Sequence, residues 1–246
     1  MIRVFNDYDA LSLAAAEMFV NLADQAIKAN GRFSVALSGG NTPHRLYEIL
    51  AADRFREKVH WENVHVFWGD ERCVPPDDPR SNFLMARRTL LNLVPIPVDQ
   101  IHPIRGDLDP AEAATQYDKE LRKFFSGQPP IFDLILLGLG DNAHTASLFP
   151  HTTVLSEGER LVSEIYVAEQ SMYRVTMTAP LINQARDVIF LVSGAEKASA
   201  LQNVLEGAYL PHEYPAQLIH PNDAHPIWLV DQASAHKLTS DTIEPA

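Results

Sequence analysis

The stretch 132–150, FDLILLGLGDNAHTASLFP, restricts the fold of this 246-residue chain more than any other segment. It contains the unbroken apolar run 134–137, whose length is typical of a strand buried on both faces of a parallel sheet. Gly138 and Gly140 follow directly, and glycine allows the backbone to take a positive φ or to approach a ligand closely. We therefore expect a buried parallel strand whose carboxyl end opens into a ligand-binding crevice.

The polar cluster that closes this stretch contains His144, the only group in it that titrates near neutral pH. Residues 138–143 also match the glycine pattern of dinucleotide-binding folds. That pattern requires a helix that begins within it, and Pro150 blocks a long helix here. We therefore interpret the segment as a crevice around His144 and not as a dinucleotide site.

Short apolar runs elsewhere alternate with segments in which apolar residues recur at helical spacing. Strands are predicted at 2–5, 32–37, 64–68, 134–137, 161–168, 173–177, 188–192 and 227–230. Helices are predicted at 8–29, from 42 onward, after Ser81, at 109–125, at 179–185 and from about 193 to 205. This alternation predicts one α/β domain over residues 1–246, with a single doubly wound, mostly parallel sheet and helices on both faces. Residues 232–246 are expected to form a loose C-terminal tail.

The segment SGGNTP, residues 38–43, joins a predicted strand to a predicted helix. Thr42 is expected to cap the helix, with Pro43 as its first residue. A glycine turn at a helix N-terminus offers free backbone N–H groups and a positive dipole end to an anion. We predict that phosphate binds to the residues of this turn, Ser38, Gly39, Gly40, Asn41 and Thr42. A tight turn that binds nothing is the alternative, and the Walker-type ending is missing.

Charged residues follow other strand ends. Asp70 and Glu71 come after the strand 64–68 and are either catalytic carboxylates or solvated turn acids. Arg72 is a better candidate for a binding residue, because its planar guanidinium matches phosphate or carboxylate. Arg174 projects from the strand 173–177. Lys197 lies in the first turn of a predicted helix, where the dipole disfavours a cation. It therefore indicates a bound anion, with a surface lysine of no special role as the alternative.

Composition narrows the classes of partner. The net charge of −12 argues against nucleic acid, whose binding needs a basic surface. No segment approaches the roughly 18 apolar residues of a membrane span. Because acidic residues stand where a signal peptide carries positive charge, we expect a cytoplasmic protein. The single cysteine, Cys73, excludes an internal disulfide, and the histidines lack metal-ligand spacing. We therefore expect no metal, a small-molecule substrate, and a monomer or small homo-oligomer.

Four segments, 38–43, 69–75, 138–150 and 174–201, together resemble the 6-phosphogluconolactonase family in order and spacing. The resemblance extends over nearly the whole chain. It implies a Rossmann-like fold, shared with glucosamine-6-phosphate deaminases/isomerases. The implied activity is hydrolysis of 6-phosphoglucono-δ-lactone to 6-phosphogluconate in the pentose phosphate pathway, without metal or organic cofactor. The resemblance also supports the turn 38–42, Arg72, Arg174 and Lys197 as the phosphate site.

We expect His144 to act as general base on the water that attacks the lactone carbonyl. Many members of the family have Asp-Gly directly before this histidine, whereas this chain has Asn142 and Ala143. Asn142 can hydrogen-bond the ring but cannot stabilise an imidazolium by charge, so Asp141 or Asp70 is a candidate to supply the acid. Ala143 implies that the turn does not require a positive φ.

Two alternatives come from other functional classes. The deaminases/isomerases usually continue from the histidine into Ala-Phe-Asn-Glu-Pro, which supplies a Glu for ring opening. This chain has no Glu in residues 145–150, and Arg72 stands where those enzymes have an aromatic residue, so the lactonase is favoured. A non-catalytic sugar-phosphate sensor is the second alternative, although such regulators usually carry an added DNA-binding segment that this chain lacks.

Overall fold

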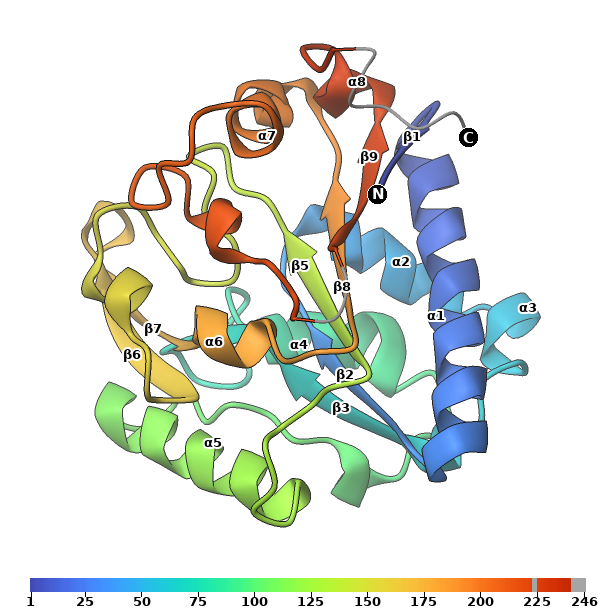
Figure 1. Ribbon diagram of the computed structural model, residues 1–246. Helices are drawn as coiled ribbons and strands as arrows, with labels where there is room; N and C mark the ends of the chain where they lie inside the picture. The colour runs from blue at the N-terminus through green and yellow to red at the C-terminus, as the bar shows by residue number, and fades with distance from the viewer. Residues whose placement is uncertain (223–224, 240–246) are drawn as a thin grey trace.

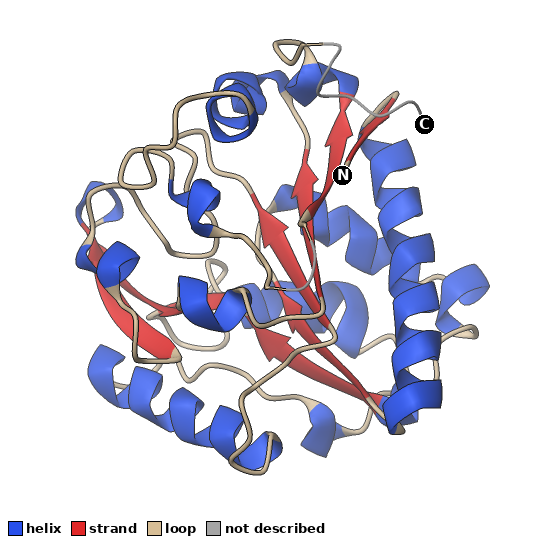
Figure 2. Ribbon diagram, in the orientation of Figure 1, coloured by secondary structure: helices blue, strands red, loops and turns tan. Residues whose placement is uncertain are grey.

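The computed structural model describes residues 1–222 and 225–239, which form a parallel sheet between helices and a smaller antiparallel sheet beside it (Figures 1 and 2). The strands are β1 (Ile2–Phe5), β2 (Phe33–Leu37), β3 (Val64–Trp68), β4 (Asp70–Arg72), β5 (Leu134–Gly138), β6 (Val162–Val167), β7 (Met172–Met177), β8 (Asp187–Val192) and β9 (Ile227–Asp231). The helices are α1 (Tyr8–Asn30), α2 (Asn41–Ala51), α3 (Asp53–Arg56), α4 (Asn82–Ala86), α5 (Pro110–Phe124), α6 (Ala179–Ile182), α7 (Ala198–Leu205) and α8 (Gln232–Ala235).

The six-stranded sheet has the order β1-β9-β8-β5-β2-β3, and all neighbouring strands are parallel. The predicted α/β fold with a doubly wound parallel sheet is confirmed. From β2 the chain moves to β3 on one side, and later strands are added on the other side, beginning with β5. Strand order therefore reverses between β2 and β5, and ligands of such sheets bind at the carboxyl ends of the strands at this point. Both strands end there in glycine-containing turns.

Helices cover both faces of this sheet (Figure 2). Crossovers between parallel strands are right-handed, so α1 and α2 lie on one face and α5, α6 and α7 on the other. The predicted boundaries of α1 are confirmed: Asp7 accepts the backbone N–H of Ala10 at 2.8 Å, and Gly31 ends the helix with φ 75°. No helix within the described ranges is long and apolar enough to cross a membrane.

The antiparallel sheet, in the order β4-β7-β6, is the main difference from the sequence prediction of a single sheet. Two predicted strands became β6 and β7, which pair with each other instead of joining the large sheet. The short connection 168–171 makes them a hairpin, and a hairpin is antiparallel. The segment β4 was not predicted as a strand because it consists only of charged residues, and it is held by pairing with β7.

Two further boundaries differ from expectation. Helix α2 begins at Asn41 with Gly40 as its N-cap, so the prediction of Thr42 as the cap was wrong. Gly40 has φ 98°, a conformation that glycine adopts readily, and this lets the helix begin earlier. The predicted loose tail was wrong for its first part, because residues 232–235 form α8, whose N-cap Asp231 accepts the N–H of Ser234 at 2.7 Å. Residues 240–246 lie outside the described residues.

A pair of histidines lies between β3 and α5. Nδ1 of His65 is 3.3 Å from Nε2 of His102, and Nδ1 of His102 is 3.0 Å from a carboxylate oxygen of Glu120. The ring of His102 stacks on Phe67 with centroids 4.3 Å apart. Burial lowers the pKa of His65 to about 4 and also lowers the pKa of His102. Burial therefore favours the neutral form of both rings at pH 7.

Candidate active site

A cavity of ≈ 340 Å³ opens at the carboxyl ends of β2 and β5, where strand order reverses. Its wall brings together segments that are far apart in the sequence: the turn after β2, the strand β4, the loop after β5, β7 and the turn after β8. All but one of the residues predicted for the site line it, namely Ser38, Gly39, Gly40, Asn41, Thr42, Asp70, Arg72, His144, Arg174 and Lys197. Asn142, the exception, lies behind His144.

The ring of His144 is held on three sides, by Phe149, Gly140 and Asn142. The ring stacks on Phe149 with centroids 4.0 Å apart and an angle of 17° between the planes. On another side lies Gly140, where an added Cβ would come within 2.0 Å of the ring Nδ1. The glycine is therefore needed so that the ring can pack against the backbone, which the glycine pattern alone did not reveal. Burial is the main cause that lowers the pKa of His144 to about 4, and the ring is neutral at pH 7.

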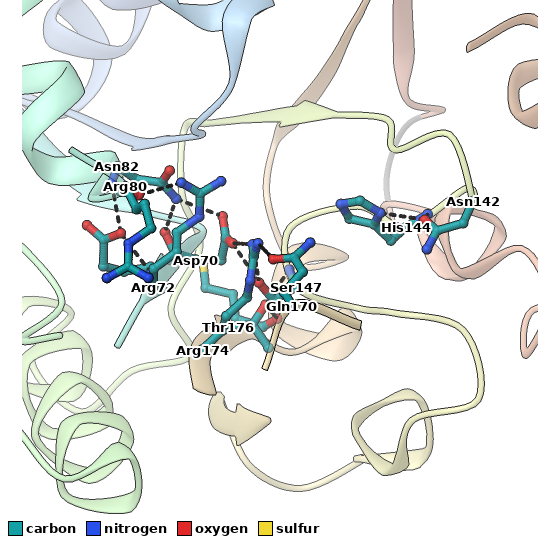
Figure 3. Close-up of polar contacts among 12 residues, drawn as sticks. Asp70, Arg72, Arg80, Asn82, Asn142, His144, Ser147, Gln170, Arg174 and Thr176 are labelled. Atoms are coloured by element: carbon teal, nitrogen blue, oxygen red, sulfur yellow. Dashed lines mark hydrogen bonds and ion pairs between the residues drawn. The ribbon is translucent and has the colours of Figure 1, made fainter. Parts of the chain in front are cut away.

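Asn142 contacts His144 twice (Figure 3). Its Oδ1 lies 2.5 Å from ring Nδ1 and accepts the backbone N–H of His144 at 3.2 Å. The carboxylate of Asp141 accepts the backbone N–H of Asn142 at 3.0 Å. No carboxylate among the described residues forms a hydrogen bond or an ion pair with the His144 ring, so neither Asp141 nor Asp70 takes the position of the missing acid.

The expectation that the turn before His144 does not require a positive φ was wrong. Ala143 has φ 61°, and Ala146, on the other side of the histidine, has φ 46°. This left-handed conformation costs a residue with a Cβ roughly 1–2 kcal/mol. The family's usual glycine would adopt it without that cost, so the turn keeps its shape here although the residue has changed.

Asp70 and Glu71 are both buried, so they are not solvated turn acids. Their contacts differ, so they do not act as a pair with one role. Asp70 accepts a hydrogen bond from Ser147 at 2.6 Å and lies 3.4 Å from Nη1 of Arg174 (Figure 3). Glu71 accepts the backbone N–H groups of residues 72, 82 and 83 and the hydroxyl of Ser81. Glu71 therefore anchors the start of α4, and only Asp70 faces the cavity.

Three cationic side chains reach the cavity. Arg72 and Arg174 are opposite each other on β4 and β7, and each has a buried Nε with no acceptor among the described residues. Arg174 is also hydrogen-bonded through Nη2 to Gln170. Lys197 ends the 3₁₀ turn Ala195–Lys197 and is the N-cap of α7, so it lies at the N-terminus of the predicted helix, although α7 itself begins one residue later. Within the described ranges Lys197 has no ion-pair partner, which leaves its charge available to a ligand.

The turn after β2 offers hydrogen-bond donors to the cavity. The hydroxyl of Tyr47 accepts the backbone N–H of Ser38 at 3.1 Å and donates to its carbonyl at 2.8 Å, so the backbone of Ser38 is already satisfied. The side-chain oxygen of Ser38 is buried and has no hydrogen-bond partner in the described part of the chain. The N–H groups of Asn41 and Thr42 lie in the first turn of α2, where a helix leaves its donors free. Donors arranged in this way are suited to bind an anion.

Sequence reasoning missed several residues of the site. Asn82 packs against Gly39, where an added Cβ would lie 1.8 Å from its Oδ1, and it donates to the backbone carbonyl of Asp70 at 2.9 Å. Ser147 was recognised only as part of a polar cluster, although it contacts Asp70. Glu196 also lines the cavity. Only Glu196 had a local signal, as the neighbour of Lys197; the roles of Asn82 and Ser147 depend on contacts between distant segments.

The chain is similar to known proteins over almost its whole length. The family described as glucosamine-6-phosphate isomerases/6-phosphogluconolactonase matches residues 6–228. A 6-phosphogluconolactonase of Nostoc sp. is 43% identical over 242 residues, which cover 97% of this chain and 98% of that protein. A human 6-phosphogluconolactonase is 36% identical over 243 residues, with 97% and 94% covered. The solved structure of 6-phosphogluconolactonase from Trypanosoma brucei has a TM-score of 0.84 and 30% identity, with 97% of this chain and 98% of that one covered.

Proposed function

The chain belongs to the glucosamine-6-phosphate isomerase/6-phosphogluconolactonase family, and we propose that it hydrolyses 6-phospho-D-glucono-1,5-lactone to 6-phospho-D-gluconate in the pentose phosphate pathway. The observation that carries this proposal is one cavity that joins a neutral histidine to an anion-binding surface. A δ-lactone is an activated ester, so a positioned base and water are sufficient for its hydrolysis.

His144 acts as the general base. With Nδ1 turned toward Asn142, the other ring nitrogen, Nε2, is left to accept a proton from the attacking water. The water adds to the lactone carbonyl, and the proton on His144 then passes to the ring oxygen as the ester bond breaks. Hydrogen-bond donors of the glycine turns, or a side-chain cation, stabilise the oxyanion of the tetrahedral intermediate.

The phosphate group binds to the turn 38–42 together with Arg72, Arg174 and Lys197. The support comes from three features of the described residues: Lys197 has no ion-pair partner among them, the Nε atoms of both arginines have no acceptor there, and the first turn of α2 has free N–H groups. Asp70 offsets part of the charge of Arg174, at 3.4 Å, and Ser147 and Asn82 hold this carboxylate in place. Binding at the phosphate end positions the lactone carbonyl near His144.

The deaminase/isomerase reaction lacks such support. In that signature the Glu stands four residues after the histidine, and here this position is Leu148, which is fully buried. Thr145, directly after the histidine, donates its hydroxyl to the carbonyl of Gly138 at 2.9 Å and is also buried. A cytoplasmic location and a monomer or small homo-oligomer remain predictions from the sequence.

The proposal is tested by lactone hydrolysis at a pH low enough to slow the spontaneous reaction. We expect fast turnover by the wild-type protein and a loss of about 10²- to 10⁴-fold in kcat for His144→Ala and His144→Asn. His60→Ala, at an exposed histidine, is the matched control and keeps the wild-type rate. Wild-type hydrolysis no faster than the blank would refute the function, and near wild-type kcat in His144→Ala would refute the base.

A further inference from the structure

The contacts of Asn142 determine which nitrogen of His144 carries the proton. The backbone N–H of His144 can only donate, so the side-chain atom of Asn142 that lies 3.2 Å from it is the oxygen. The same Oδ1 is 2.5 Å from ring Nδ1. An oxygen accepts and does not donate, so Nδ1 carries the hydrogen. If the amide of Asn142 were turned the other way, its NH₂ group would donate to Nδ1 and the ring proton would lie on Nε2. A protonated Nε2 cannot accept a proton from water.

The local backbone keeps the amide in this orientation. Ala143 has φ 61°, and this sharp turn brings the N–H of residue 144 back to the side chain of residue 142. The ring cannot move away, because Phe149 stacks on one face and Gly140 lies against Nδ1. In Figure 3, Asn142 lies on one side of the ring and the group around Asp70 and Arg174 on the other.

The charged groups that act on the ring come from four elements. Arg174 on β7 and Lys197 before α7 oppose a second positive charge in the cavity. Asp70 on β4 acts in the other direction, but its carboxylate is already bonded to Ser147 and Arg174. Asp141 lies in the exposed part of the loop, with its carboxylate on the N–H of Asn142. The only hydrogen-bond partner of Nδ1 among the described residues is thus the uncharged amide.

We propose that Asn142 is a positioning residue that fixes His144 as the Nδ1–H tautomer without adding negative charge, so that Nε2 stays free of protons into the acidic range. This inference rests on the proposed function in assigning the role of base to His144. An aspartate at this position would hold the same tautomer but would also stabilise the imidazolium. The enzyme therefore works at lower pH than an enzyme with an acid there, and it gives up charge stabilisation of the protonated histidine during turnover.

The first test compares pH profiles of kcat/KM for the wild type and Asn142→Asp, which have side chains of equal shape. We expect the acid limb to move to higher pH by at least about one unit in the variant, because the carboxylate favours the protonated ring. The double variant Asp141→Asn/Asn142→Asp keeps the net charge of the loop and is the control. It must show the same shift if the contact at Nδ1 is responsible. An unmoved acid limb in Asn142→Asp overturns the proposal.

The second test does not depend on hydrolysis. Long-range ¹H–¹⁵N spectra report the tautomer of each histidine, and the spectrum of His144→Gln identifies the signals of His144. We expect Nδ1–H in the wild type at pH 7 and in Asn142→Asp, and a shift toward Nε2–H in Asn142→Ala. Nε2–H in the wild type, or an unchanged tautomer in Asn142→Ala, overturns the proposal. A protein with the Nδ1–H tautomer but no lactone hydrolysis would refute the proposed function and leave the tautomer assignment intact.

Discussion

The hydroxyl of Ser147 donates a 2.6 Å hydrogen bond to the carboxylate of Asp70 and so ties the loop that carries His144 to β4. The backbone N–H of Ser147 donates in turn to Thr176 on β7, at 3.1 Å. The antiparallel sheet therefore positions the histidine loop as well as the two arginines that face the cavity. The position of His144 therefore depends on contacts outside the parallel sheet from which its loop emerges.

Replacing Ser147 by alanine tests this coupling. The variant leaves a buried carboxylate without one of its donors, and we expect the free energy of unfolding to fall by about 1–3 kcal/mol. We also expect kcat to fall at least about tenfold, because the loop is less well positioned. Urea unfolding and lactone hydrolysis measure the two effects. Ser12→Ala is the matched control, because Ser12 is equally buried but its hydroxyl has no hydrogen-bond partner in the described ranges. Equal effects in both variants would contradict the coupling.

Ala143→Gly is expected to leave the stability of the protein nearly unchanged. It removes the cost of a left-handed alanine, roughly 1–2 kcal/mol, but it adds back about 0.4–1 kcal/mol of unfolded-state entropy and loses a buried methyl group worth about 0.8 kcal/mol. Because these contributions nearly cancel, the free energy of unfolding, measured by urea unfolding, should hardly change. The control, Ala14→Gly in the middle of α1, should instead lose about 1 kcal/mol. A loss of similar size at position 143 would show that this turn is not strained.

Lys197→Met tests the phosphate site. Loss of one charge-assisted contact should raise KM for the phosphorylated lactone by about 10- to 100-fold, with little change in kcat. The KM for the unphosphorylated lactone should hardly change, because that substrate has no group for Lys197 to bind. Lys28→Met, which removes an exposed lysine paired with Asp24, is the control. A similar rise in KM for both lactones would argue against a role in phosphate binding.

Acid should destabilise the protein through the histidine pair between β3 and α5. Because burial lowers the pKa of His65 from 6.5 to about 4, the unfolded chain binds more protons than the folded one between these values. The free energy of unfolding is therefore not reduced by this histidine above pH 6.5, and it decreases as the pH drops from 6.5 toward 4. His65→Gln should lose less stability between pH 7 and pH 5 than the wild type in urea unfolding. Identical pH dependence in the two proteins would exclude this pair as the cause.

The sequence predicted the strands of the parallel sheet well, because each is a short, mostly apolar run bounded by turn residues. It did not predict β4, since Asp70, Glu71 and Arg72 show no alternation and become a strand only through pairing with β7. For the same reason β6 and β7 were assigned to the wrong sheet. Pairing partners are tertiary information, and local patterns contain little of it.

The cavity wall was predicted more completely than its supporting contacts. Residues such as Arg72 and Lys197 could be found because each follows the carboxyl end of a strand. The carboxyl ends of all strands in a parallel sheet lie at the same edge. Asn82 could not be found, because its place is defined by the missing side chain of Gly39. The positive φ of Ala143 was also missed, since alanine gives no local signal for it.

The pairing of the first strand with the last has a consequence for synthesis of the chain. Ile2 is paired with Trp228 and Phe5 with Asp231, so β1 gains its neighbour in the sheet only after residues 227–231 have been made. Until then the edge of β1 is unpaired on a growing chain, while β2 and β3 can already form their ladder. Folding on the ribosome should therefore begin at the β2–β3 side and finish when β9 leaves the ribosome, and truncation before β9 would leave β1 without its place in the sheet.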